Sequence, residues 1–464
     1  MSSSDRAPDP ARPVQPGATS TLRPLVLLEG ATLLSGAGNG AALVVLPWLV
    51  LERTGSAGSA GLLAAATALP LLLSSLFSGT VVDRFGRRAT AVGSDLLSAA
   101  SVAAIPIVDH LIGLNMVWLI ALAVIGAVFD PAGVTARETM LPAAAGRAGW
   151  PLSRANGVHE AVWGVAFMLG PGLGGVLIAW VGAVNALWVT AVGFVLSAAM
   201  VCALRVPHAT RAVRAGTDGA AVDTHVWRET LDGLRFVRRD ALLLALTVMT
   251  ALLVSVYMPI EGVLLPVEFE AQDQPGRLGV VVMAMSAGGV AGALGYGVFG
   301  HRIRRSLVFR SALLLTAVFL MVLAVLPPFW VMVVASFAIG VAYGPVGPIL
   351  NLAMQTRSPE HMRGRVVGII SSSEYAAGPV GYLVVGAATE RFGVRTTFVV
   401  VSVVILAVAI AGLLVRSLRE LDDLAEAIDE PHDVAHAIDV ATSGVAPLVQ
   451  PPRDPDHSLH RADD

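Results

Sequence analysis

Six acidic residues lie inside long apolar stretches of this 464-residue chain, and they are the first candidates for chemistry. Burying an ionised carboxylate in apolar surroundings costs free energy unless the group is paired, protonated or hydrated. Each of these acids is therefore expected to have a partner or a functional role. A carboxyl group held away from water can also take up and release protons near neutral pH as its surroundings change. The six are Glu29, Asp95, Asp130, Glu160, Glu261 and Glu374.

Depth within the apolar stretches separates these acids, at about 1.5 Å per helical residue. Glu29 and Glu160 lie near the ends of their stretches, which favours a hydrated gate or an interface. Asp130 and Glu374 lie deeper, and we expect a proton-coupling or substrate-binding role for them. Glu261 lies toward the outer third of its stretch and is a further candidate for that role.

Other polar residues in the stretches are few. Asn39 lies midway along the first stretch between two glycines, where it could line a cavity or make a hydrogen bond between helices. No basic residue lies as deep in the first half of the chain, and Arg137 falls near the end of its stretch. We predict neither a metal site nor a cofactor.

The stretches that hold these residues indicate a membrane protein. Hydrophobic residues make up 55% of the chain and charged residues 14%, and the apolar residues fall in long blocks. A bilayer core of about 30 Å needs roughly 20 apolar residues in a helix, and a dozen blocks reach that length. One cysteine, Cys202, excludes an intramolecular disulfide. Nothing in the composition suggests binding to nucleic acid.

Twelve blocks predict twelve helices in two sets of six. The first six run over Leu25–Leu51, Ala57–Val82, Thr90–Val108, Met116–Ala136, Gly157–Val181 and Val184–Leu204. The second six run over Ala241–Pro266, Leu278–Gly300, Leu307–Leu326, Phe329–Met354, Val366–Ala388 and Thr396–Val415. We therefore predict a disordered arm at 1–23, a bundle at 24–204, a linker at 205–240 with an interfacial helix, a second bundle at 241–418 and a disordered tail at 419–464.

Arginine placement predicts the orientation, because positively charged loops stay on the cytoplasmic side. The chain has 31 arginines and no lysine. If both termini are cytoplasmic, four arginines lie outside and the other 27 of 31 lie inside. The four are Arg53, Arg277, Arg391 and Arg395. We therefore expect both termini, the arm, the linker and the tail in the cytoplasm.

The two halves repeat one another in two places. The fifth block carries the sequence GPGLGG from Gly170, and the eleventh carries GPVG from Gly378. The second block ends in SGTVVDRFGRR and the eighth in YGVFGHRIRR, so Gly297 matches Gly79. Repeated halves related by an axis along the membrane normal place a binding site between them near the midplane.

The end of the second block carries the clearest motif, GTVVDRFGRR. Gly79 permits close approach of a neighbouring helix, Asp83 can accept charge-assisted hydrogen bonds, and Gly86 allows a tight turn. The pattern resembles motif A of the major facilitator superfamily. That resemblance implies an all-α membrane protein of the major facilitator fold, with twelve transmembrane helices in two pseudo-symmetric six-helix bundles. It also implies a cytoplasmic latch of Asp83 with Arg84, Arg87 and Arg88, and we expect Asp95 to join this charge network.

A second motif, GVAFMLGPGLGG, resembles motif C of the same superfamily, which is associated with antiporters. Its residues are Gly164, Gly170, Pro171, Gly174 and Gly175, and close packing or a kink would use the same residues. Stretches such as LPWLVLERTGSAGSAG from Leu46 and FDPAG from Phe129 resemble the branch of macrolide-type drug exporters and the enterobactin exporter.

The resemblance implies a secondary transporter of the plasma membrane that exports small amphipathic or lipophilic molecules by proton antiport. No GxxxxGK loop, HExxH or GxSxG elbow is present, so we predict no enzyme and no ATP-driven step. The expected partners are a small-molecule substrate, protons and the lipid bilayer, and we expect a monomer. A dedicated exporter of one metabolite such as a siderophore is the alternative, and a non-transporting scaffold or receptor is more remote.

Overall fold

The computed structural model describes residues 21–204, 224–359 and 362–423, and the secondary structure in these ranges is helical throughout. Many large apolar side chains point outward, among them Trp180 at 82% exposure and Leu414 at 76%. An apolar outer surface of this kind suits lipid rather than water. The chain is a multi-pass membrane protein, as its composition predicted.

Six long helices form the N-terminal half. They are α1 (Arg23–Thr54), α2 (Ala57–Phe85), α3 (Arg87–Ile112), α4 (Met116–Ala148), α5 (Leu152–Val181) and α6 (Ala183–Ala203). All six begin and end within a few residues of the predicted blocks or extend beyond them. The longest extension is in α4, which continues twelve residues past the predicted end at Ala136.

The C-terminal half has less regular helices. It contains α8 (Ala241–Pro259), a π-helical turn (Ile260–Leu264), α9 (Leu265–Glu270), α10 (Pro275–Phe299), α11 (Arg305–Ala324), α12 (Phe329–Tyr343), α13 (Val346–Arg357), α14 (Arg363–Phe392) and α15 (Val394–Leu414). The segments from α8 to α9 follow one another without a gap, and only Gly344 and Pro345 separate α12 from α13. These irregular segments lie beside the candidate site described below.

Eleven of these helices are long and apolar enough to cross a membrane, among the residues that the structure describes. The helix α14 is not one of the eleven. Its middle carries Ser371, Ser372, Ser373 and Glu374, and these polar residues lower its hydropathy. The eleventh predicted block therefore corresponds to a 30-residue helix without the apolar composition of the others.

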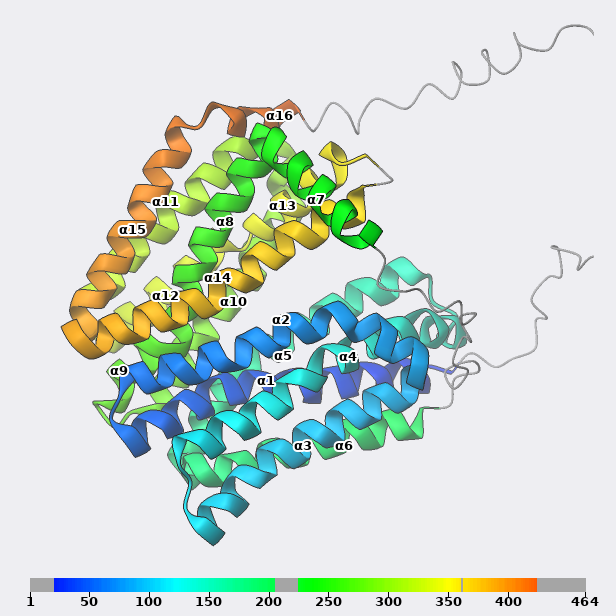
Figure 1. Cartoon of the computed structure of the whole chain (residues 1–464), viewed down its shortest axis with the longest axis vertical. Coiled ribbons are helices and arrows are strands. Elements are labelled where there is room, and N and C mark those ends of the chain that lie inside the picture. The colour runs from blue at the N-terminus through cyan, green and yellow to red at the C-terminus, as the bar shows by residue number, and fades with distance from the viewer. Residues whose placement is uncertain (1–20, 205–223, 360–361, 424–464) are drawn as a thin grey trace, which may run out of the picture.

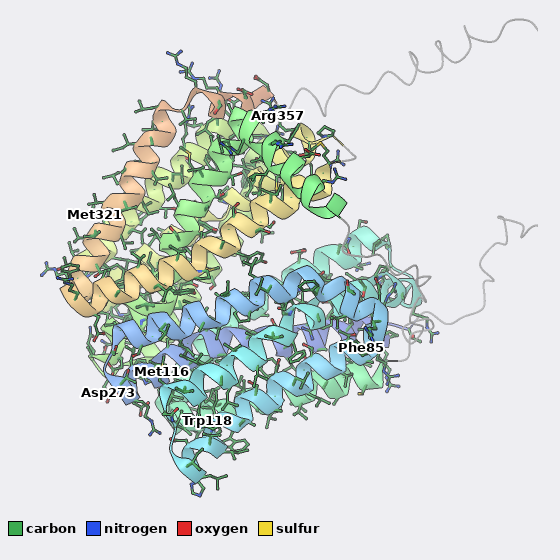
Figure 2. The ribbon with its side chains drawn as sticks, in the orientation of Figure 1. Phe85, Met116, Trp118, Asp273, Met321 and Arg357 are labelled. Atoms are coloured by element: carbon green, nitrogen blue, oxygen red, sulfur yellow. The ribbon has the colours of Figure 1, made fainter. Side chains whose placement is uncertain are left out.

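The two ends of the bundle differ. The linker side is the end at which α1 begins, α6 ends and α7 (Thr224–Arg239) lies, and the far side is the opposite end. Phe85 and Arg357 mark the linker side in Figure 2, and Met116 and Asp273 mark the far side. The ribbons of the two halves meet near the far side and diverge toward the linker side (Figure 1).

The linker and the beginning of the tail pack on the C-terminal half. The helix α7 occupies the position of the predicted interfacial helix, and its Gly233 lies against Arg365 and Ile369 of α14. Residues 205–223 of the linker lie outside the described residues, as do 1–20 of the arm and 424–464 of the tail. The described start of the tail is a short helix, α16 (Glu420–Asp423), whose Asp422 accepts hydrogen bonds from Ser306.

The internal repeat of the sequence is also seen in the structure, where two equivalent turns follow α5 and α14. Gly182 after α5 has φ 83° and ψ 160°, and Gly393 after α14 has φ 81° and ψ 159°. Only glycine adopts this conformation readily, so both halves turn at the same point through the same residue type. Residues of α5 and α14 can therefore be matched by an offset of 211, counted from these glycines. The two motifs that suggested the repeat, matched at Gly170 and Gly378, differ by 208, so they lie three residues apart in the structural correspondence.

Candidate functional site

A buried ion pair lies at the centre of the N-terminal half. Arg137 Nη1 on α4 donates to Asp95 Oδ1 on α3 at 3.0 Å, and the two side chains are only 1% and 2% exposed. Ser35 on α1 donates to the same oxygen at 3.0 Å, and Ser197 on α6 donates to Oδ2 at 2.7 Å. One carboxylate thus joins four helices, and Arg137 balances its charge within the bundle.

This cluster differs from the sequence-based expectation for two residues. Arg137 was expected near a helix end, but α4 continues to Ala148 and places its side chain in the interior. Asp95 was expected in the charge network of Asp83. The structure gives it Arg137 as its basic partner instead, because Arg137 is within reach across the α3–α4 contact.

Asp130 has a different environment from that of Asp95. Asn39 Nδ2 on α1 donates to Asp130 Oδ1 on α4 at 2.8 Å, and the pair is partly buried. None of the ion pairs formed between described residues includes Asp130. Its carboxyl group can therefore gain or lose a proton without breaking an ion pair. Asn39, whose role the sequence left open, makes an interhelical hydrogen bond.

Near the linker side, Glu29 of α1 is buried against a histidine of α5. His159 Nδ1 lies 3.1 Å from Glu29 Oε2 and 3.2 Å from Oε1, and the residues are 5% and 7% exposed. The neighbouring Glu160 is exposed. The helix end thus holds one buried acid with a titratable partner and one acid at the surface, instead of two equivalent hydrated acids.

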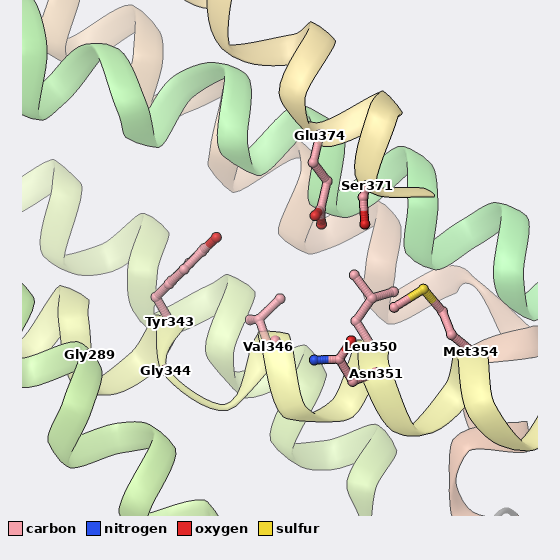
Figure 3. Close-up of a pocket in the computed structure, with 10 residues that line it drawn as sticks. Gly289, Tyr343, Gly344, Val346, Leu350, Asn351, Met354, Ser371 and Glu374 are labelled. Carbon is pink, nitrogen blue, oxygen red and sulfur yellow. The ribbon is translucent and has the colours of Figure 1, made fainter. Parts of the chain in front are cut away.

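A cavity of about 330 Å³ lies in the C-terminal half and contains Glu374. Figure 3 shows Glu374 and Ser371 of α14 on one wall, facing Leu350 and Asn351 of α13 across the cavity. Tyr343, the last residue of α12, lines it as well. The cavity therefore combines one carboxylate, two small polar groups, an aromatic ring and aliphatic side chains.

The cavity forms where a membrane helix is interrupted. Pro345 lacks the backbone N–H that a continuous helix would need, and the helix breaks between Tyr343 and Val346. The preceding Gly344 lies so close to α10 that a Cβ atom there would be 2.4 Å from the carbonyl oxygen of Gly289. Broken helices in membranes are tolerated where they are buried in protein or line a cavity.

Glu261 lies on the second irregular segment. It is the second residue of the π-helical turn, which follows Pro259, and π-helical turns are frequent at functional sites. Tyr257, one helical turn earlier, stacks on Tyr343 with ring centroids 4.6 Å apart. The tyrosine pair thus connects the segment of Glu261 to the cavity of Glu374.

The residues of motif A lie at the linker end of α2 without an ion pair at Asp83. Asp83 and Arg84 are exposed, and Asp83 takes part in none of the ion pairs between described residues. Arg87 donates to the carbonyl of Thr139 at 3.1 Å, and Arg88 donates to the carbonyl of Cys202. These two arginines fix the loop to α4 and α6, so a latch with Asp83 is not formed in this conformation.

The two glycines of motif A were expected to allow a tight turn at Gly86 and a close helix contact at Gly79. Gly86 has φ 86°, so the predicted tight turn is present there. A Cβ atom at Gly79 would have no atom within 4 Å, so the close helix approach that we expected at Gly79 is absent from this conformation.

The motif C residues pack α5 between α1 and α10. A Cβ atom at Gly170 would lie 2.8 Å from the Cα of Gly40, and one at Gly174 would lie 2.8 Å from the carbonyl oxygen of Ala41. Pro171 also contacts Gly40. On the opposite face, Gly175 abuts Gly279 of α10, and Gly164 faces Val290. All five of these motif C residues are thus at close contacts between helices.

Three partners of the predicted acids were missed from sequence: Arg137, His159 and Tyr257. Tyr257 precedes Glu261 by four residues, which places both on the same helical face. Helical spacing could have indicated this pair. The contacts of Arg137 with Asp95 and of His159 with Glu29 depend on how the helices pack on one another.

Comparison with known proteins gives a consistent result. Residues 28–270 and 262–447 match the model of the Major Facilitator Superfamily. The chain is 43% identical over 408 residues to the multidrug efflux pump Tap of Mycolicibacterium fortuitum, covering 87% of this chain and 98% of that protein. It is 23% identical over 385 residues to macrolide efflux protein A of Streptococcus pyogenes, covering 81% of this chain and 92% of that protein.

The fold resembles solved structures at low sequence identity. The crystal structure of a mutant of the nucleoside transporter NupG aligns with a TM-score of 0.70 and 12% identity, covering 85% of this chain and all of that one. At this identity the likeness concerns the fold alone. The resemblance to the superfamily and to its macrolide-type exporters, drawn from the motifs, is confirmed by these matches.

Proposed function

This chain belongs to the Major Facilitator Superfamily, and from that premise we propose that it exports small amphipathic or lipophilic molecules in exchange for protons by alternating access. The observation that carries the proposal is the 43% identity to a protein named as a multidrug efflux pump, over 98% of its length. Its relatives and structural neighbours are transporters, which confirms the expectation that the chain is not an enzyme.

The proposed topology has twelve crossings with both termini in the cytoplasm. The helix α14 is the eleventh crossing along the chain and completes the twelve, since it is 30 residues long and packs on α2 of the N-terminal half and on α8 of the C-terminal half. The linker side faces the cytoplasm of the cell, because 27 of the 31 arginines belong to the segments predicted from the sequence to be cytoplasmic. The far side then faces outward from the plasma membrane, and the protein acts as a monomer.

Asp130 is the proposed proton carrier. It lies in mid-helix and is hydrogen-bonded to the neutral Asn39, so protonation there costs no ion pair. Asp95 is a poorer candidate because three side chains, including Arg137, converge on its carboxylate. Glu29 with His159 lies nearer the linker side and is suited to a gate.

Substrate binding is assigned to the cavity of Glu374. Its aliphatic and aromatic walls suit the apolar part of an amphipathic molecule, and Glu374, Ser371 and Asn351 offer polar contacts. The π-helical turn with Glu261 follows Tyr257, which stacks on Tyr343 of the cavity wall, and movement of the turn would change the shape of the cavity.

Alternating access assigns a role to motif A in the other conformation. When the halves close on the linker side, Asp83 becomes the latch acid, with Arg84, Arg87 and Arg88 as the basic members of the same loop. The exposed position of Asp83 here fits a latch that is open. Motif C keeps α5 close to α1, within the N-terminal half, while the halves rock.

The experiment is transport into proteoliposomes with and without an imposed pH gradient, using ethidium and a macrolide as probes. Wild type should accumulate at least one probe only with the gradient. Asp130→Asn should lose the dependence on the gradient, because an amide at that position cannot carry a proton. Asp109→Asn, which removes an acid paired with Arg53 near the far side, is the matched control and should transport normally.

Two results would count against the proposal. Equal transport at all pH gradients in wild type would favour passive movement of the substrate. Gradient-dependent transport that is unchanged in Asp130→Asn would remove Asp130 from the coupling mechanism.

Loss of transport in Asp83→Asn, with binding of the probe retained, would support the latch.

A further inference from the structure

Two helix pairs join the halves near the far side, and the internal repeat relates one pair to the other. In the first pair, α2 meets α14, and a Cβ atom at Gly61 would lie 3.0 Å from the Cα of Gly386. In the second pair, α10 meets α5, and a Cβ atom at Gly279 would lie 3.0 Å from the Cα of Gly175. We call these pairs the α2–α14 seam and the α10–α5 seam.

The correspondence between the seams extends to the neighbouring atoms. Gly61 is also close to the carbonyl oxygen of Tyr382, at 2.5 Å from its Cβ position, and Gly279 is close to that of Pro171, at 3.0 Å. Tyr382 and Pro171 are separated by the same offset of 211 as the turn glycines Gly393 and Gly182. The two seams are therefore one packing arrangement used twice.

One seam contains an acidic contact between the halves. Glu390 Oε2, near the far end of α14, accepts hydrogen bonds from Ser56 Oγ and from the backbone N–H of Gly58, each at 3.0 Å. Ser56 is the N-cap of α2, and Gly58 is the second residue of that helix. A carboxylate at a helix N-terminus satisfies an otherwise unpaired N–H and interacts favourably with the helix dipole.

The other seam lacks this contact. The offset of 211 matches Glu390 to Ala179 of α5, and the methyl group of Ala179 lies 3.8 Å from the Cβ position of Gly276, the second residue of α10. Gly276 is the counterpart of Gly58 in the repeat. Both seams thus bring the end of one helix to the N-terminus of another, but only the α2–α14 seam carries a side chain that can accept its N–H groups.

We propose that Glu390 is the positioning residue that holds the far side closed, as a latch from α14 to the N-terminus of α2. The proposal rests on the alternating access proposed above, because the far side must open for a substrate to leave. Opening there requires the two hydrogen bonds of Glu390 to break, whereas the α10–α5 seam has only packing to lose. The asymmetry makes closure of the far side depend mainly on one seam.

The test measures the distance between spin labels at residues 52 and 395, which are exposed near the far side in opposite halves. The labels are introduced in a Cys202→Ser background, since Cys202 is the chain's one cysteine. Pulsed electron paramagnetic resonance is recorded in lipid nanodiscs without substrate or pH gradient. Glu390→Ala should increase the ratio of long to short distances by about threefold to tenfold, the range expected for loss of a helix cap. Glu390→Gln, which keeps an acceptor oxygen without the charge, should give a smaller increase.

Two further variants make the test specific. Ala179→Glu places an equivalent carboxylate beside the N–H of Gly276, so adding it to Glu390→Ala should restore the short distance. Asp109→Asn breaks the far-side ion pair with Arg53 inside one half and should leave the distances of wild type unchanged.

An unchanged distance distribution in Glu390→Ala would overturn the latch, as would an equal shift in Asp109→Asn. The outcome is separable from that of the export proposal, because no substrate is present. If Glu390→Ala opens the far side but the wild-type protein transports no probe, the proposed latch stands and the proposed export function fails.

Discussion

Two aspartates in the same half of the protein show how neighbours decide what a buried acid can do. Asp95 receives hydrogen bonds from Arg137, Ser35 and Ser197, which come from three other helices. Asp130 receives one from the neutral Asn39. The first arrangement fixes a charge in place and ties the bundle together, and the second leaves a carboxyl group free to change its protonation state.

The stability of the N-terminal half should depend on the Asp95–Arg137 pair. Arg137→Met would leave the Asp95 carboxylate buried without a counter-charge, at a cost of about 3–5 kcal/mol in the free energy of unfolding. Adding Asp95→Asn to Arg137→Met should recover part of this loss, because neither charge then remains. The measurement is denaturant unfolding of the purified protein in detergent.

The control is a pair that is exposed. Asp232→Asn removes the partner of Arg235 on α7, where the side chains are 55% and 67% exposed, and should change the stability by less than about 0.5 kcal/mol. An Arg137→Met variant as stable as wild type would show that the buried pair contributes nothing to folding.

At the scale of single residues, the sequence locates the acids in apolar surroundings but does not predict their partners. An acid in an apolar stretch is visible from the sequence alone, because its cost does not depend on the fold. The partners of Glu29 and Asp95 come from α5, α4, α1 and α6, and which side chains meet is decided by how the helices are rotated and packed. Arg137 was missed because α4 continues beyond the apolar stretch from which its end was predicted.

At the scale of helices, glycines determine how closely α5 approaches its neighbours. Gly170 and Gly174 face α1, and Gly175 faces α10, where a Cβ atom would lie 2.6 Å from the carbonyl oxygen of Pro275. Backbone atoms cannot rotate away as a side chain can. The motif that suggests an antiporter is therefore also the surface on which the N-terminal half packs internally and against the other half.

Two alanine substitutions in α5 should have opposite effects. Gly175→Ala should separate α5 from α10 and destabilise the protein by about 1–3 kcal/mol, as overpacking does. Gly157→Ala, where a Cβ atom meets nothing within 4 Å, should be neutral or stabilising by up to about 1 kcal/mol through helix propensity. Thermal unfolding in detergent measures both, and equal Tm values for the two variants would contradict the packing role of Gly175.

The positions of helices were predictable, while their irregularities were not. Each predicted block corresponds to a helix or to two or three consecutive helical segments in the structure. The break between α12 and α13 and the π-helical turn after α8 were not predicted, because proline and glycine are also tolerated in continuous membrane helices. The break between α12 and α13 borders the cavity of Glu374, and the π-helical turn follows Tyr257, which stacks on Tyr343 of the cavity wall. The site therefore depends on features that hydropathy does not report.

At the scale of the whole molecule, two related halves meet through two seams and differ in the charges they carry. The N-terminal half holds the Asp95–Arg137 pair and Asp130, and the C-terminal half holds the cavity with Glu374. The sequence repeat predicted two related halves. It did not predict the conformation, in which the halves meet near the far side, since both conformations of a rocking bundle use the same helices.

The most direct test of proton-coupled export is to measure proton movement when a substrate is added. Inside-out membrane vesicles are acidified within, and a pH-sensitive dye reports their lumen as ethidium or a macrolide is supplied outside. Exchange predicts that protons leave the lumen as the substrate enters it, so the dye signal should recover in wild type and not in Asp130→Asn. Substrate accumulation with no change in the dye signal would contradict proton antiport.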